Sequence, residues 1–142
     1  MAFDEIHLND VQGLFGGRNI YLKNNGEFMI QIVHRGHFED RKRGVLPQNM
    51  LDKIIRTVTE IKFESIEIKQ RPGVPDEAQP QITIFLDDKC MSRAKWANDR
   101  HTEFDIIYNL LLEVAALDIK KVIYSGEYKY DFFPDGFKKR FD

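Results

Sequence analysis

The chain has 142 residues, of which 42% are hydrophobic and 31% charged, and its formal net charge at pH 7 is -2. A chain of this size is expected to fold as one domain with a sizeable core. The composition excludes a disordered chain, and the near-neutral charge excludes an overall electrostatic attraction to nucleic acid or to an anionic membrane. The single cysteine, Cys90, excludes an internal disulfide framework and favours a reducing, cytoplasmic location.

No segment has the character of a membrane span or of a secretory signal. The longest apolar stretch, 106–117, is interrupted by Asn109 and Glu113 and is too short to cross a bilayer. The first ten residues contain early acidic residues and lack the apolar core of a signal peptide. We therefore expect a cytoplasmic protein that binds no membrane.

The first part of the chain predicts three strands and a helix. Residues 18–34 alternate apolar and polar positions around Asn24–Gly26, which is the pattern of a tight β-hairpin. Residues 37–46 continue as a third strand, and their charged run is typical of an exposed edge strand. A helix is expected over 47–62, with its apolar residues on one stripe. No regular element is assigned to residues 1–17, which end in a glycine-rich stretch.

The second part predicts a strand over 65–69, a hairpin of 81–86 with 90–96, a helix from Asp99 to Leu117 and a strand over 120–128. Asp99 is the expected N-cap of that helix, since its carboxylate can accept amide hydrogens of the first turn. The order β-β-β-α-β-β-β-α-β favours an α+β fold, in which two helices pack on a largely antiparallel β-meander sheet. Residues 1–142 are expected to form a single domain with an aromatic-rich C-terminal extension at 119–142.

The loop segment 71–101 concentrates turn residues, charges and the single tryptophan. Pro72 and Gly73 fit the two central positions of a type II turn. If the hairpin turns at 87–89, the chain returns close to this loop. The candidate binding residues are Arg71, Asp76, Glu77, Lys95, Trp96 and His101. They form either a brace, with the acidic side chains paired to Lys95 or Arg100 beside Trp96, or a binding site for a partner.

The same segment offers one enzymatic alternative. Asp76, Asp87 and Lys89 imitate the spacing of metal-dependent nucleases, where two carboxylates hold a divalent cation and a lysine stabilises charge. Asp87, however, is expected in the hairpin turn rather than on a strand. The histidines predict no metal site, because His34 and His37 lie among basic residues. We expect no metal and no cofactor, and the sequence favours a non-catalytic protein.

The C-terminal segment supplies a second candidate partner surface, which consists of Tyr128, Tyr130, Phe132, Phe133, Phe137 and Phe141. These rings either pack the tail onto the sheet or face a partner protein. Together with the basic residues at 41–43, they also leave open a nucleic-acid-binding accessory protein, because aromatic and basic side chains combine in binding single strands.

Several short motifs resemble those of a group of uncharacterised bacterial proteins. The motifs are GGR at 16–18, RPGVPDEA at 71–78, KWAND at 95–99 and FDIIY at 104–108. The resemblance extends from Gly16 to Ala116 and implies a bacterial, intracellular protein. It carries no assigned activity and no catalytic residues.

We therefore expect a small non-catalytic module that binds another protein, of an immunity type or a regulatory type. A metal-dependent hydrolase and a nucleic-acid-binding accessory protein remain the alternatives, with nucleic acid the less favoured partner. The sequence does not indicate an oligomeric state.

Overall fold

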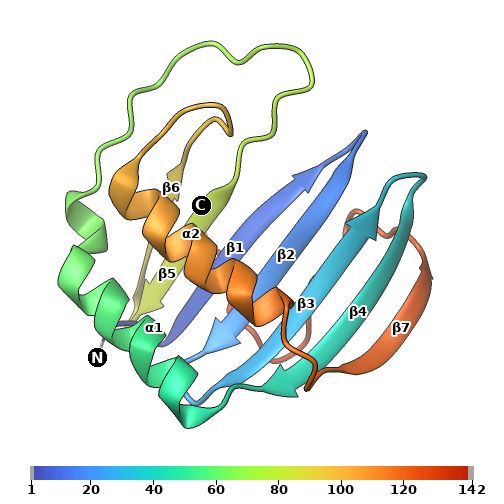
Figure 1. Cartoon of the computed structure of the whole chain (residues 1–142), viewed down its shortest axis with the longest axis horizontal. Helices are drawn as coiled ribbons and strands as arrows, with labels where there is room; N and C mark the ends of the chain where they lie inside the picture. Colours follow the sequence, from blue (N-terminus) through green and yellow to red (C-terminus); the bar gives the residue numbers. More distant parts are fainter. Residues whose placement is uncertain (1, 141–142) are drawn as a thin grey trace.

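The computed structural model describes residues 2–140 and shows a seven-stranded antiparallel sheet with two helices on one face (Figure 1). The strands are β1 (Glu5–Gln12), β2 (Gly16–Lys23), β3 (Glu27–His34), β4 (Phe38–Val45), β5 (Gln81–Leu86), β6 (Lys89–Ala94) and β7 (Lys121–Glu127). The helices are α1 (Gln48–Ile61) and α2 (Thr102–Ala115), and a short 3-10 turn (Phe63–Ser65) follows α1. The predicted α+β fold is confirmed. Neither of the helices in the described chain is long and apolar enough to cross a membrane.

The sheet runs in the order β6-β5-β1-β2-β3-β4-β7. Strands β1 to β4 form a meander, the β5–β6 hairpin joins it at β1, and β7 pairs with β4. The prediction that 37–46 forms an edge strand is therefore wrong, since β4 is paired on both sides. Its charges mislead because Arg41 donates to Glu39 at 2.5 Å, so both are neutralised within the fold. Strands β6 and β7 form the two edges.

The main core lies between the sheet and the helices. Helix α1 contributes Leu51, Ile54 and Val58, and α2 contributes Phe104, Ile107, Leu110, Leu111 and Val114. The facing strand residues include Ile6, Leu8, Ile20, Leu22, Ile30, Ile82 and Ile84. Each strand places alternate residues on this face, as the two-residue period of an extended chain requires. The helix predicted over 47–62 is observed within one residue at each end.

Strand β1 is the element that the sequence does not predict. Ile6 and Leu8 face the helices, whereas Glu5 and His7 face the other side and are also buried. A strand buried on both faces usually has a continuous apolar run, and Glu5 and His7 interrupt that run in β1. The sequence pattern of this segment therefore resembles that of a loop. The C-terminal tail makes their burial possible, and this long-range contact leaves no local signal in the sequence.

The strand predicted at 65–69 is absent. Ile66 is buried in the core, but its carbonyl accepts a hydrogen bond from Arg93 Nε at 2.9 Å instead of from a neighbouring strand. A second nitrogen of Arg93 donates to the carbonyl of Glu64. Since a side chain satisfies these backbone groups, the segment stays extended without joining the sheet.

The tail after β7 covers the face of the sheet opposite the helices. Phe137 packs against Tyr21 and Met29, with Phe132 and Phe133 beside them. Two buried carboxylates fix the tail backbone: Glu39 accepts from the amide of Lys129 at 2.7 Å, and Glu5 accepts from that of Lys138 at 2.9 Å. Charged acceptors of this kind form strong hydrogen bonds when they are shielded from water. The sheet is thus covered by helices on one face and by the tail on the other.

Replacing a tail ring tests this second layer. Phe137 is 8% exposed and Phe38, on the surface of β4, is 48% exposed. We expect Phe137→Ala to lower the free energy of unfolding by roughly 2 to 4 kcal/mol, because it removes a buried ring, and Phe38→Ala to change it by less than about 1 kcal/mol. Urea denaturation followed by circular dichroism measures both. Equal effects of the two variants would contradict the described packing of the tail.

Candidate functional site

Arg71 is the centre of the loop cluster. Its Nη2 donates to Glu77 Oε2 at 2.8 Å, and its Nε donates to the Asp99 carboxylate at 3.0 Å. The guanidinium therefore joins two carboxylates that belong to different loops. These hydrogen bonds raise the pKa of Arg71, and the bond from Arg71 is the main cause that lowers the pKa of Glu77. Planar guanidinium groups suit such a two-sided contact better than lysine does.

Trp96 packs on the same arginine loop. Its indole Nε1 donates to the carbonyl of Arg71 at 2.9 Å, and the guanidinium lies 5.7 Å from the ring centroid. Gly73 lies under the ring, where a Cβ would come within 2.4 Å of Trp96. The absence of a side chain at Gly73 is thus what lets the tryptophan lie on the loop.

The loop turns at a different place from the predicted one. The amide of Glu77 donates to the carbonyl of Val74 at 3.2 Å, which puts Pro75 and Asp76 at the centre of the turn. Asp76 has a φ of 65°, the left-handed value that a type II turn needs at its third position. The turn predicted at Pro72 and Gly73 is therefore wrong. Asp76 is exposed and lies outside the Arg71 cluster.

Lys95 and His101 hold the start of α2. Lys95 is buried, and its Nζ contacts Asp105 Oδ1 at 2.7 Å and the carbonyl of Asp99 at 2.6 Å. His101 is the N-cap, since its Nδ1 accepts from the amide of Phe104, and its Nε2 contacts the carbonyl of Glu67. The predicted N-cap at Asp99 is wrong because Arg71 already binds that carboxylate.

Five of the six candidate residues in the loop segment therefore lie in one connected region, and Asp76 does not. The cation that pairs with Glu77 is Arg71, not Lys95 or Arg100 as the sequence suggests. Lys95 pairs instead with Asp105 on α2. Local sequence cannot show this choice, because all three cations lie within reach of the loop in the predicted hairpin.

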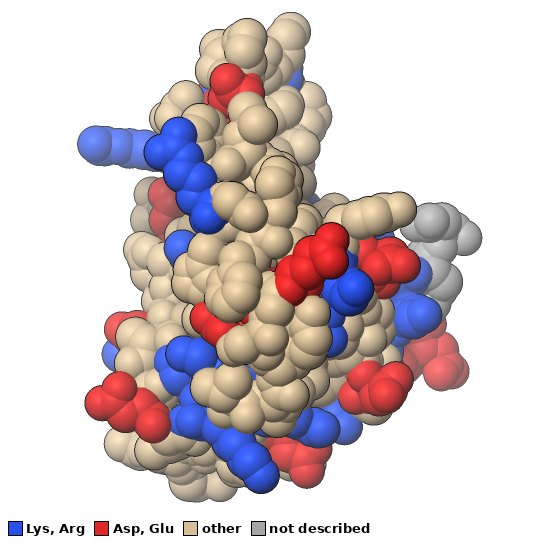
Figure 2. Space-filling model, turned by 90° about the vertical axis from the view of Figure 1, so that its right-hand side faces the viewer, with Lys and Arg blue, Asp and Glu red and all other residues tan. Residues whose placement is uncertain are grey.

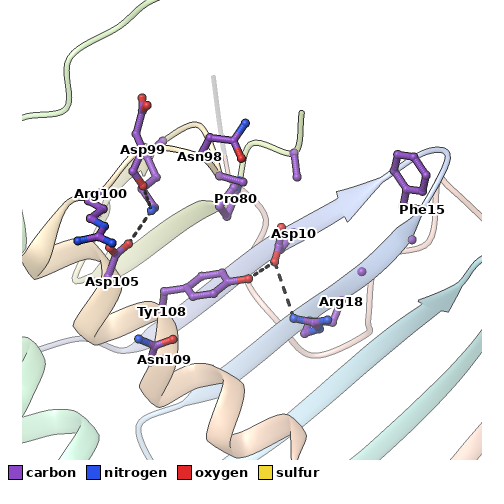
Figure 3. A pocket seen from close by; sticks show the side chains of 15 residues that line it. Asp10, Phe15, Arg18, Pro80, Asn98, Asp99, Arg100, Asp105, Tyr108 and Asn109 are labelled. Carbon is purple, nitrogen blue, oxygen red and sulfur yellow. Dashed lines mark hydrogen bonds and ion pairs between the residues drawn. The ribbon is translucent and has the colours of Figure 1, made fainter. Parts of the chain in front are cut away.

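An open cleft of about 610 Å³ adjoins this region (Figure 3). One side is formed by the end of the β1–β2 hairpin, the other by residues 95–100, and the base by α2. Its lining includes Asp10, Phe15, Arg18, Asp99, Arg100 and Tyr108. A cleft of this size with polar groups that converge on it is a usual place for binding.

A carboxylate–phenol pair lies within the cleft. The hydroxyl of Tyr108 donates to Asp10 Oδ2 at 2.5 Å, and Arg18 Nη1 lies 4.0 Å from the same oxygen (Figure 3). Burial raises the pKa of Asp10, although the bond from Tyr108 and the charge of Arg18 oppose the rise. Burial and the carboxylate together raise the pKa of Tyr108. The pair joins β1 to α2 and fixes the base of the cleft.

Two arginines of the cleft differ in how they are paired. Asp99 and Asp105 are bound to Arg71 and Lys95, and Asp10 is bound to Tyr108. Arg18 has only its 4.0 Å contact with Asp10. Arg100 is exposed and makes no ion pair within residues 2–140. Arg100 is thus a cation of the lining that has no counter-ion among the described residues.

The hairpin tip beside the cleft was not identified by the sequence patterns. Leu14 and Phe15 are 58% and 51% exposed, and the guanidinium of Arg35 lies 5.2 Å from the Phe15 ring. The side chain of Gln12 accepts from both of their amides. Gly16 follows with a φ of 85°, and a Cβ there would lie 2.1 Å from the carbonyl of Val33. Apolar residues next to obligatory glycines are the signal that could have indicated an ordered, exposed tip.

The residues of the hydrolase alternative do not come together. Asp87 lies in the turn between β5 and β6, as expected, and its amide donates to Asp4. Asp76 lies beyond the other end of β5, whose six residues separate the two carboxylates by roughly 20 Å at the usual rise of a strand. Among the described residues, no three histidine, cysteine or acidic side chains gather as metal ligands.

The tail candidates lie mostly on the sheet. Phe137 is buried, and Tyr128, Phe132 and Phe133 are partly buried, whereas Tyr130 is 85% exposed. Arg41 from the basic segment lies between the rings of Tyr124 and Phe132 and is paired with Glu39. It is therefore not free to bind phosphate. Phe141 lies outside the described residues.

Comparison with protein-family models, with curated proteins and with solved structures finds no match to this chain.

Filling the space under the tryptophan tests the loop packing. We expect Gly73→Ala to lower the free energy of unfolding by roughly 1 to 3 kcal/mol, because the new methyl group pushes Trp96 off the loop. Gly13→Ala is the matched control, since a Cβ there meets nothing within 4 Å. Trp96 is the only tryptophan, so its emission maximum reports the displacement directly. An unshifted emission in Gly73→Ala would contradict the described contact.

The raised pKa of Asp10 predicts a dependence of stability on pH. The pKa of Asp10 is higher in the folded state than in the unfolded state. At pH values between the two, the folded state binds more protons, so a fall in pH through this range stabilises the folded state. We expect wild type to gain stability relative to Asp10→Asn on acidification from about pH 7 to about pH 4. Tyr108→Phe should move this gain to higher pH, because the hydrogen bond that lowers the Asp10 pKa is lost. Urea unfolding at several pH values measures both, and a constant difference would contradict the prediction.

Proposed function

We propose that this protein is a non-catalytic module that binds another protein, of an immunity type or a regulatory type, and that the cleft beside the β1–β2 hairpin holds the partner. The observation that carries the proposal is the exposed Leu14–Phe15 tip, which stands beside a cleft where Arg100 has no ion pair within residues 2–140. Aromatic and arginine side chains supply much of the binding energy at protein interfaces.

The chemistry of the cleft favours a particular kind of partner segment. Phe15 offers an apolar contact at one end, and Arg18 and Arg100 offer positive charge along the sides. A segment with an apolar side chain followed by an aspartate or glutamate fits both. The tip enters this contact in an ordered state, because Gln12 and the glycines fix its backbone. Little conformational entropy is then lost on binding.

The ion pairs around the cleft support a binding role rather than catalysis. Lys95 and Asp105 bind each other, and Asp99 is bound by Arg71. These groups position the cleft wall and the start of α2. The pair of Asp10 and Tyr108 likewise links two elements of the fold. A protein that acts by binding a partner needs no catalytic residue in addition to these.

Affinity capture with immobilised protein, followed by titration calorimetry with the purified partner, tests the proposal. We expect Phe15→Ser to weaken binding by at least about tenfold, because it removes an aromatic anchor. Arg18→Glu should weaken it by a similar factor, and the affinity of wild type should fall as salt increases.

Tyr130→Ser is the matched control, since it removes an exposed ring from the tail instead of from the hairpin tip. It should leave the affinity unchanged. Loss of the partner from Tyr130→Ser together with its retention by Phe15→Ser would move the interface to the tail and contradict the cleft. A partner whose binding responds to none of the three variants would contradict both surfaces.

A further inference from the structure

A second groove, with a volume of about 480 Å³, lies on the face of the sheet that the tail covers. One side is formed by side chains of β1, β2 and β5 that alternate with the core residues, and the other by residues 130–133 and 139–140 of the tail. The sheet residues are His7, Asn9, Asn19, Tyr21, Gln81 and Thr83. The groove shares no lining residue with the cleft on the helix side, so its role is independent of the function proposed above.

His7 places a hydrogen-bond acceptor in this groove. The residue is 3% exposed, and its Nε2 lies 2.9 Å from Glu5 Oε1. Since the same carboxylate oxygen also accepts the amide of Lys138, Nε2 carries the hydrogen, and Nδ1 of the neutral ring is an acceptor. Nδ1 makes no hydrogen bond with a described residue. No fully buried side-chain nitrogen or oxygen within residues 2–140 lacks a partner, so Nδ1 must reach the surface of the groove that His7 lines.

Tyr21 places a hydroxyl beside this acceptor. The residue is 2% exposed and lies opposite His7 on the neighbouring strand. Among the described residues, its hydroxyl has one contact, which it accepts from Asn9 Nδ2 at 3.5 Å, and it donates to none. Burial raises the pKa of Tyr21 to about 12, so the hydroxyl keeps its proton at neutral pH. A ligand hydroxyl both donates and accepts, so His7 and Tyr21 together suit a molecule with neighbouring hydroxyl groups.

The tail side of the groove adds two cations. Lys139 and Arg140 are exposed, and neither makes an ion pair within the part of the chain that the structure describes. Asp131 is the acidic residue of the described lining, so the cations outnumber it. Figure 2 looks onto the neighbouring β7 side and shows basic and acidic side chains intermixed there, so that side offers no broad cationic surface to an anion. Lysine and arginine side chains are the usual partners of phosphate groups.

We propose that this groove binds a small phosphorylated sugar, either free or as part of a nucleotide. The sugar hydroxyls contact His7 and Tyr21 on the sheet, and the phosphate contacts Lys139 and Arg140 on the tail. The volume lies within the usual range for sites that bind small molecules. Because the two sets of contacts come from different segments, the bound molecule also fastens the tail to the sheet and stabilises the folded chain.

Titration calorimetry with ribose 5-phosphate tests the proposal, and ribose alone and inorganic phosphate alone serve as its two halves. We expect ribose 5-phosphate to bind at least about tenfold more tightly than either half and to raise the Tm, because both sets of contacts then form at once. Adenosine monophosphate distinguishes the two sources of the shared group. Tighter binding than that of ribose 5-phosphate identifies a nucleotide, and weaker binding identifies a free sugar phosphate.

Two variants separate the hydroxyl contacts from the phosphate contacts. Tyr21→Phe removes one oxygen and should weaken ribose 5-phosphate by about fivefold, while the affinity for inorganic phosphate stays unchanged. Lys139→Ala should weaken both by about tenfold, because it removes a charge that phosphate contacts. Lys53→Ala is the matched control, since it removes an exposed lysine from α1 on the opposite face of the sheet. Circular dichroism melts check that each variant is folded, and Lys139→Ala alters an exposed side chain that the core does not need.

Three results would each overturn the proposal. Inorganic phosphate that binds as tightly as ribose 5-phosphate would mean that the cations alone account for binding. Neither heat nor a change in Tm with any probe at about 10 mM would mean that the groove takes no such molecule. Binding that Lys139→Ala weakens no more than Lys53→Ala does would place the bound molecule elsewhere on the protein.

Discussion

The bridge from Arg71 to Glu77 and Asp99 is the contact on which the candidate site depends. Arg71 and Glu77 belong to one loop, Asp99 lies 28 residues from Arg71 along the chain, and one guanidinium brings the two carboxylates together. Once Asp99 is held, Lys95 can reach its carbonyl and His101 is left to cap α2. The start of α2 in turn sets the position of Tyr108, which binds Asp10 on β1. One arginine therefore fixes the wall at residues 95–100, and Tyr108 links α2 to the wall that the paired strands β1 and β2 form.

The sequence predicts the fold wherever a pattern is local. The hairpin around Gly26, the stripe of α1 and the turn at Asp87 follow from residues near one another, and all three are observed. Strand β1 and the interior position of β4 are missed for a common reason. Their polar residues, such as Glu5 and Glu39, are covered by the tail, and a pattern of polar residues gives no sign that a distant segment will bury them.

The contacts within the loop segment are predicted only in part. The sequence groups six residues there, and the structure brings five of them together, but with other ion-pair partners than the sequence suggests. A charged residue in a loop has several possible counter-ions, and the choice depends on backbone geometry at Gly73 and Asp76, which sequence spacing does not determine. The cleft itself is missed, because its walls, the β1–β2 hairpin and residues 95–100, come from segments that are far apart in the sequence.

The hydrogen bonds that hold the tail use side chains of the sheet but only main-chain amides of the tail. Lys129 and Lys138 bind Glu39 and Glu5 through their main-chain amides, so any residue except proline can make the same contact at those two positions. The carboxylates have no such freedom, since no other side chain provides the same charge and reach. The side chains that fix the backbone of this last segment therefore lie on β1 and β4, far earlier in the chain.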